Sequence, residues 1–367
     1  MLPKQSDIVI FDREGCDEIT EYIVKYEEYI IVDSHIKYYY LNPYFIIIYL
    51  KNLIFSINSF KNLLSIIYKT YFLTIINFIN PKIVITYIDD NILYHWLSKH
   101  YKGPTYIAIQ NGIRQKFHKK LLNKEYCHEH FYCFGEYDLK KHNELGHQIK
   151  YGHPIGSLRS GIFFENQKNK FDTNYDICLI SMWINPKKCK NNKLLDDINK
   201  HSHQVNINLA KYAKKNNKKI SIALRTSTDE EYNYYFKLFD NSASIFKYNH
   251  QKYSSYNLSQ QSNLTVSFMS TSVLEALALN KKALFIDTSM TNDYVDYDDA
   301  IRYKFSKYND FEKKINYLLD EPYDQYLMAL NNIKKNAINL DLDNLPQQII
   351  KNHLLQILNK ENEPKFN

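Results

Sequence analysis

The sequence predicts an α/β protein with two Rossmann-like domains in tandem, each built on a parallel β-sheet. Short, nearly continuous apolar strands alternate with helical patterns, which is typical of parallel sheets covered by helices on both faces. A polar stretch without periodicity, around residues 164–174, interrupts the alternation and indicates a domain boundary. A length of 367 residues suffices for two domains, and a hydrophobic content of 44% excludes intrinsic disorder.

The first domain is expected over residues 1–165. Apolar, β-branched runs predict strands at 8–12, 29–33, 82–90, 106–110 and 130–134. Helical patterns fill most of residues 50–79. The most apolar stretch, residues 38–79, is interrupted by Lys51, Lys61 and Lys69, which leaves no run long enough to span a bilayer. We expect buried core helices here, and an amphipathic face in peripheral contact with a membrane is the alternative.

The second domain is expected over residues 175–340, after a linker at 166–174. Strands are predicted at 176–180, 219–224, 244–246, 264–268 and 282–287, with helices near 194–216, 229–239, 253–260 and 271–279. A C-terminal helix at about 345–359 lies within a final segment, residues 341–367. In such an arrangement ligands bind in a central cleft, between the carboxyl edges of the two sheets.

Glycine is scarce, and its distribution excludes several function classes. Seven of the eight glycines lie between Gly103 and Gly161, and none follows. Neither a GxGxxG nor a GxxxxGK loop can be written with this sequence, so classical dinucleotide binding and P-loop chemistry are not expected. Phosphate recognition in residues 175–340 must therefore depend on side-chain hydroxyls and a helix N-terminus.

Charge and cysteine content indicate the compartment and exclude one partner. The net charge of +7 is scattered and accompanies no nucleic-acid-binding signature, so nucleic acid is not an expected partner. The five cysteines form no regular framework, and the first residues lack the apolar region of a signal peptide. We expect a cytoplasmic protein, with the inner face of the cytoplasmic membrane as an alternative location.

The candidate nucleotide site begins where a buried strand ends at Phe268. Ser270, Thr271 and Ser272 follow at the start of a helix, whose free N–H groups and partial positive charge suit a phosphate. Glu275 lies about one turn further, where a carboxylate can accept hydrogen bonds from ribose hydroxyls. The alternative is a capping box, Ser272-x-x-Glu275, that satisfies the donors of the helix itself.

Three further residues are candidates for nucleotide binding. Arg225 ends a strand at the expected cleft, and its guanidinium suits a phosphate or carboxylate, although a surface arginine is the alternative. Asn249 and His250 follow the next strand and are candidates to frame the base.

In the first domain, candidate catalytic and acceptor-binding residues follow strand ends. Asp89 and Asp90 suit a general base or nucleophile at a sugar carbon, with helix capping as the alternative. Asp89 is the favoured catalytic carboxylate, because it ends a strand that is expected to face the cleft. Acceptor or sugar binding is expected from the polar residues of the next strand end and of a turn-rich run before the linker. These residues are Gln110, Asn111, Arg114 and His153, the last followed by Pro154.

A metal centre is not expected. Cys127, His128, His130 and Cys133 match no standard zinc spacing, and alternation along a strand would point neighbouring side chains to opposite faces. The Asp296–Asp298 and Asp341–Asp343 pairs have the form of DxD sites, but both lie in polar, acidic loops.

Several short runs carry a resemblance to a known group of proteins. They are Ile88–Asp89, Ile109–Arg114, Phe134–Tyr137, Pro154–Arg159, Ile222–Arg225 and Ser270–Lys282. Over residues 82–290 the chain resembles bacterial surface-carbohydrate biosynthesis proteins, which look like GT-B glycosyltransferases and include retaining β-Kdo transferases that use CMP-Kdo. His153-Pro154 is similar to the His-Pro motif of bacterial sialyltransferases and capsule Kdo transferases, although here it precedes the linker.

The resemblance implies transfer of a sugar, Kdo or a related acidic sugar from CMP, onto a bacterial surface polysaccharide or lipopolysaccharide. The second domain would bind the nucleotide sugar, and the first would bind a glycan or lipid-linked oligosaccharide acceptor. Such a donor requires neither a metal nor another cofactor. The alternatives are a GT-B enzyme with a UDP-sugar donor, transferase or epimerase, and a non-catalytic subunit of glycan assembly.

Overall fold

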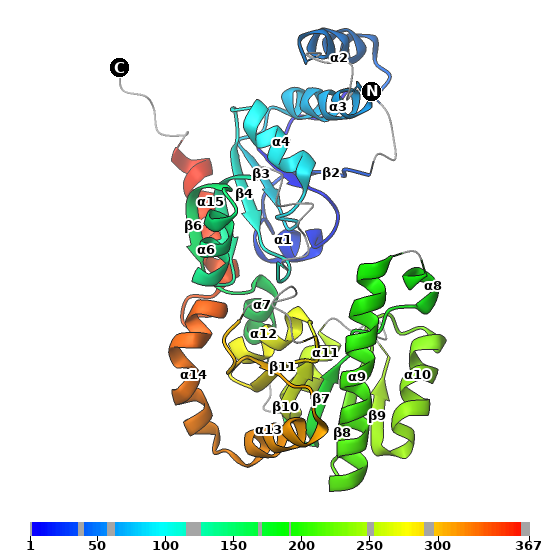
Figure 1. The fold of residues 1–367 in the computed structure, drawn as a ribbon. Helices are drawn as coiled ribbons and strands as arrows, with labels where there is room; N and C mark the ends of the chain where they lie inside the picture. Colours follow the sequence, from blue (N-terminus) through cyan, green and yellow to red (C-terminus); the bar gives the residue numbers. More distant parts are fainter. Residues whose placement is uncertain are drawn as a thin grey trace. The chain divides into compact units, whose positions relative to one another are not determined.

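The computed structural model describes residues 2–35, 40–56, 63–114, 126–167, 171–190, 192–247, 253–289 and 297–360, without the side chains of 55, 56, 331, 332 and 360. The chain forms two compact units (Figure 1). The first comprises residues 1–111, 120–162 and 341–367, and the second comprises residues 112–119 and 163–340.

The first unit contains a six-stranded parallel sheet in the order β2-β1-β3-β4-β5-β6. Its strands are β1 (Ile8–Phe11), β2 (Tyr29–Val32), β3 (Ile83–Thr86), β4 (Thr105–Ile109), β5 (Cys127–Cys133) and β6 (Gln148–Pro154). The chain adds β2 on one side of β1 and β3 on the other. Because of this reversal, a crevice is expected where the carboxyl ends of β1 and β3 diverge.

The helices of this unit, with α7 extending into the second unit, pack around an aromatic-rich core. They are α1 (Cys16–Tyr22), α2 (Pro43–Ser56), α3 (Leu63–Ile79), α4 (Ile92–His100), α6 (Glu136–Glu144), α7 (Leu158–Asn166) and α15 (Pro346–Lys360). Phe11 packs against Phe72 of α3 and Tyr94 of α4, with ring centroids 6.2 and 6.1 Å away. The expected helical region at 50–79 is therefore two helices, α2 and α3, which lie side by side (Figure 1).

Two expectations about this sheet were wrong. The turn-rich run before the linker begins inside β6, an edge strand whose polar, exposed residues conceal it in the sequence. Gly152 fits there because a Cβ atom would lie 2.6 Å from Leu139 Cδ2. The strand expected at 82–90 ends at Thr86, where the Thr86 hydroxyl donates to Phe11 O and accepts from Ile88 N–H, turning the chain.

The second unit contains another six-stranded parallel sheet, in the order β12-β11-β10-β7-β8-β9. Its strands are β7 (Tyr175–Ile180), β8 (Ile220–Ala223), β9 (Ala243–Phe246), β10 (Ser262–Ser267), β11 (Lys282–Asp287) and β12 (Arg302–Lys304). The order reverses between β7 and β10, which places the expected crevice at their carboxyl ends. The strand β12 was not expected because it is only three residues long.

Helices of the second unit separate these strands. They are α8 (Pro186–Cys189), α9 (Lys193–Asn216), α10 (Asp229–Phe239), α11 (Ser254–Gln260), α12 (Thr271–Ala278), α13 (Tyr308–Asp320) and α14 (Tyr323–Ala337), with a 3-10 turn at Asp240–Ser242. Two parallel sheets in tandem confirm the expected fold class. Within the described ranges, no helix is both long and apolar enough to cross a bilayer.

Candidate active site

In the second unit, α12 begins at the point where the strand order reverses. Ser270 is its N-cap, and the Ser270 hydroxyl accepts a hydrogen bond from Ser272 N–H at 3.3 Å. The Ser267 hydroxyl donates to Ile180 O at 2.8 Å and ties the ends of β10 and β7 together. The alternative capping box, Ser272-x-x-Glu275, is not the one that starts the helix, because the cap lies two residues earlier. Glu275 instead lies in the second turn and is only 5% exposed.

The segment Gly112–Arg114, which belongs to the second unit, lies against the start of α12. Ile113 N–H donates to Thr271 Oγ1 at 3.2 Å. A Cβ atom on Gly112 would lie 3.3 Å from the same oxygen and 3.9 Å from Arg114 Nη1. The half-buried guanidinium of Arg114 is therefore held near the N-terminus of α12, where cation and helix dipole both favour an anion. Sequence reasoning had grouped Arg114 with the acceptor site.

Arg225 is exposed in the turn after β8, and this turn is built around a carboxylate that the sequence analysis missed. The buried Glu231 side chain accepts hydrogen bonds from the N–H groups of Arg225, Thr226 and Ser227 at 2.7–2.9 Å. It also accepts from the hydroxyls of Thr226 and Ser181. The signal was present in the sequence, since Thr228-x-x-Glu231 is a capping-box pattern, and Thr228 does cap α10.

In the first unit, the carboxyl edge gathers Asp12, Asp89, Asp90 and Asn91. Asp89 is fully buried, its Oδ1 accepts Asn111 N–H at 3.2 Å, and its carbonyl oxygen lies 2.7 Å from His95 Nε2. Asp90 is half-buried. Neither aspartate caps the next helix, because the N-cap of α4 is Asn91, whose side chain also contacts Asp12.

Gln110 and Asn111, expected to bind the acceptor, have different environments. Gln110 is buried, donating from Nε2 to Asp138 Oδ1 and accepting Phe134 N–H at Oε1, each at 2.9 Å. It therefore ties β4 to the β5–α6 turn. Asn111 is half-buried beside Asp89.

His153 lies in a cluster of aromatic side chains against α15. Its Nε2 is 3.1 Å from His130 Nδ1, its ring stacks on Tyr132, and the Tyr132 hydroxyl contacts His353 Nδ1 at 2.5 Å. Burial, followed by neighbouring His353 and His153, lowers the pKa of His130 to about 4. His128 has different neighbours from His130 and lies against His95 and His142.

The remaining candidates contribute no site within the described ranges. Asn249, His250 and Asp296 lie outside them. Asp341 accepts hydrogen bonds from Asp343 N–H and Asn344 Nδ2, both at 2.9 Å, and so forms a local turn. In the portion of the chain that the structure describes, no three His, Cys, Asp or Glu side chains are grouped to hold a metal ion.

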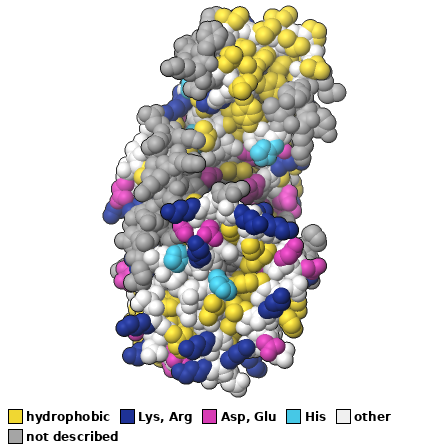
Figure 2. All heavy atoms as spheres, turned by 45° about the vertical axis from the view of Figure 1, so that its right-hand side comes forward, with side chains coloured by type: hydrophobic (Ala, Val, Ile, Leu, Met, Phe, Trp, Pro, Cys, Tyr) yellow, Lys and Arg dark blue, Asp and Glu magenta, His cyan; other side chains and the backbone are white. Residues whose placement is uncertain are grey.

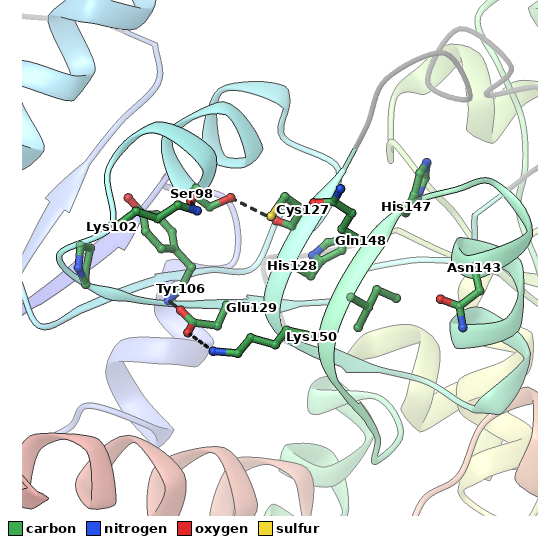
Figure 3. Close-up of a pocket in the computed structure, with 12 residues that line it drawn as sticks. Ser98, Lys102, Tyr106, Cys127, His128, Glu129, Asn143, His147, Gln148 and Lys150 are labelled. Carbon is green, nitrogen blue, oxygen red and sulfur yellow. Dashed lines mark hydrogen bonds and ion pairs between the residues drawn. The ribbon is translucent and has the colours of Figure 1, made fainter.

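A cavity of about 610 Å³ lies at the amino edge of the first sheet, opposite the carboxyl edge (Figure 3). Its lining includes His128, His147 and Lys102. Glu129 crosses it, accepting Tyr106 N–H at 3.1 Å and pairing with Lys150 at 3.3 Å. The cavity does not coincide with the strand ends at which parallel sheets bind ligands.

Comparison with known proteins identifies the fold. No family model matches the sequence, and no curated protein matches it. The chain is similar to a crystal structure of a glycosyltransferase from Rickettsia africae, with 13% identity, 98% of this chain and 100% of that chain covered, and a TM-score of 0.51. It is also similar to a variant of the wall teichoic acid polymerase TagF soaked with CDPG, with 12% identity, coverages of 98% and 91%, and a TM-score of 0.57.

A third solved structure, of S. aureus MnaA with UDP, has 10% identity, covers 96% of each chain and gives a TM-score of 0.57. Identities this low establish the architecture alone. The chain therefore has the GT-B fold, as the sequence runs from Ile88 to Lys282 led us to expect.

Proposed function

We propose that the protein is a GT-B glycosyltransferase that moves a sugar from a nucleotide-activated donor to a glycan acceptor. One observation carries the proposal: hydroxyl residues and Arg114 converge on the N-terminus of α12, at the strand-order reversal of the second sheet. A helix N-terminus with a guanidinium beside it suits the phosphate of a leaving nucleotide. The named glycosyltransferase and polymerase among the similar structures support the same reading.

The donor we propose carries a pyrimidine nucleotide. A TagF structure was soaked with CDPG and MnaA was solved with UDP, so cytidine and uridine diphosphates join CMP as candidates. CMP-Kdo remains the hypothesis drawn from the sequence resemblance. The acceptor we propose is a bacterial surface glycan, since TagF is a wall teichoic acid polymerase. The five cysteines are free thiols, which supports a reducing cytoplasm as the place of action.

For the chemistry in the first unit, we propose different roles for the two neighbouring aspartates. Asp90 is the more exposed carboxylate and is our candidate to take the proton of an acceptor hydroxyl. Asp89, the carboxylate that the sequence favours for catalysis, is buried and accepts a hydrogen bond from Asn111 N–H, so we propose it instead as a positioning residue for the turn after β4.

The test is calorimetric titration with CMP, CDP, UDP and GDP. We expect a pyrimidine nucleotide to bind. Arg114→Gln should lower its affinity about 10- to 100-fold, because the variant loses one charge-assisted hydrogen bond. Glu275→Gln is expected to weaken nucleotides while leaving inorganic phosphate unaffected, because its proposed partner is the ribose. The matched control is Arg13→Gln, an exposed arginine paired with Asp33 in the first unit, which should bind as the unmodified protein does.

Two outcomes would overturn the proposal. Binding of no nucleotide would favour the non-catalytic assembly subunit. Equal nucleotide affinity of the Arg114→Gln and Arg13→Gln variants would show that the N-terminus of α12 is not part of the nucleotide site.

A further inference from the structure

The outer surface of α2 and the start of α3 is unusually apolar. α3 is the inner helix, with Phe72 and Ile76 buried in the core of the first unit. α2 packs on α3 through aromatic pairs, including Phe45 with Tyr71 and Phe78. The opposite side of α2 faces outward with little polar character. We call this the α2 surface; it comprises Leu41, Tyr44, Ile46, Ile47, Leu50, Ile54 and Leu64.

These side chains are exposed to an extent that packing within the unit does not explain. Ile47 is 62% exposed, Ile54 is 73% exposed and Leu64 is 83% exposed. Figure 2 shows hydrophobic side chains gathered at the top of the molecule, where Figure 1 places α2. A surface helix normally turns polar residues outward, and a contiguous exposed apolar patch marks an interaction surface.

The charged side chains of α2 and α3 have one sign. Within the described helices these are Lys51 and Lys69, and neither helix contains an Asp or Glu. Lys51, the one charged residue of α2, is exposed beside Leu50. A partner that meets this surface is therefore apolar in its interior and negative at its rim.

A bilayer with anionic headgroups has this chemistry. The two helices have 14 and 17 residues, shorter than the roughly 20 that span a hydrocarbon core, so they suit a position in the interface rather than across it. Tyr44 of the α2 surface is 58% exposed, and tyrosine rings favour the headgroup level of membranes. Lysines near an anionic leaflet add electrostatic attraction.

We propose that the α2 surface docks the protein onto anionic lipid membranes, with α2 lying in the plane of the interface. This inference goes beyond the proposed transferase activity and does not depend on the donor. A protein docked in this way could reach a lipid-bound acceptor, but the docking proposal does not depend on the acceptor.

The experiment is co-sedimentation with vesicles of phosphatidylcholine alone and of phosphatidylcholine with phosphatidylglycerol. We expect binding to the anionic vesicles, weakened by salt, and little binding to neutral ones. The double variant Ile47→Glu with Ile54→Glu places two carboxylates in the proposed contact and should reduce the bound fraction at least about tenfold. Lys51→Gln should weaken binding to anionic vesicles alone.

The control is Met328→Glu, at an apolar position on α14 of the second unit that is 80% exposed. Circular dichroism checks that each variant is folded. Equal vesicle binding by the double variant and by Met328→Glu would overturn the proposal, as would no binding at all. Self-association in light scattering that the double variant abolishes, without vesicle binding, would assign the surface to a second copy of the chain.

Discussion

Glu231 shows how one buried carboxylate shapes a whole turn. It receives hydrogen bonds from three consecutive backbone N–H groups, Arg225 to Ser227, and from the Ser181 and Thr226 hydroxyls. Ser227 has φ of +55°, a left-handed conformation that the hydrogen bonds hold. Glu231 thereby positions Arg225 at the carboxyl edge without itself lying on the surface.

We predict that Glu231→Gln lowers the free energy of unfolding by about 2–4 kcal/mol. An amide presents N–H groups where all five partners donate, so it leaves buried donors unsatisfied. Urea denaturation measures the change. Glu230→Gln, at the exposed neighbouring position, is the control and should differ by less than about 0.5 kcal/mol. An equal effect of both substitutions would contradict this account of the turn.

At the scale of elements, α15 belongs to the first unit although it is the last helix among the described residues. Ile350 and Leu354 are fully buried, and His353 reaches Tyr132 of β5. The start of α15 meets α7 at Gly161, where a Cβ atom would lie 2.5 Å from Gln347 Oε1 and 2.7 Å from Pro346 Cδ. The absence of a side chain at this glycine permits the approach.

We predict that Gly161→Ala destabilises the protein by about 1–3 kcal/mol, since overpacking against Pro346 outweighs the gain of roughly 1 kcal/mol in helix propensity. Thermal unfolding provides the measurement. Gly103→Ala serves as the comparison, because its nearest neighbour is the movable end of the Tyr101 side chain. A Gly161→Ala protein as stable as the unmodified one would show that α15 does not pack closely on α7.

At the scale of the whole molecule, buried histidines couple stability to pH. Burial lowers the pKa of His95 from 6.5 to about 4, against the opposing effect of hydrogen bonds to Cys127 and Asp89. Burial also lowers the pKa of His130 to about 4, and those of His147 and His153 shift in the same direction. Each group favours the neutral form in the folded state.

The free energy of unfolding is therefore expected to be constant above pH 6.5 and to fall as the pH drops toward 4. In this range the histidines bind protons in the unfolded chain but remain neutral in the folded one. His95 alone would contribute about 3 kcal/mol over this window. Urea denaturation at a series of pH values should show a shallower dependence for His95→Gln than for His100→Gln, an exposed position on the same helix. Identical slopes would exclude His95 as the source.

Much of the fold was predictable because its core strands are apolar on both faces. Every such strand, from Ile8–Phe11 to Lys282–Asp287, has a clear local signature. The edge strands β6 and β12 were missed because their residues are largely polar. In addition, β12 is only three residues long. The hydroxyl residues at the start of α12 were predicted for the same local reason, because caps are chosen within a few residues.

The partners of the candidate site residues were not predictable. The contacts of these residues join segments that are distant in the sequence or separated by a turn. Examples are Arg114 near Thr271, the hydrogen bond from Gln110 to Asp138, and the hydrogen bond from Asn111 N–H to Asp89. Such contacts depend on strand order and register, which local sequence patterns do not determine.

By itself, the sequence determined the two runs of alternating strands and helices and the absence of glycine-rich phosphate loops. Both follow from local periodicity and composition, which act over a few residues. The tertiary structure decided which strands are neighbours, the return of α15 to the first unit, and the placement of Arg114 beside α12. These features depend on contacts between distant segments, where the burial of apolar surface has to offset the conformational entropy that the chain loses on folding.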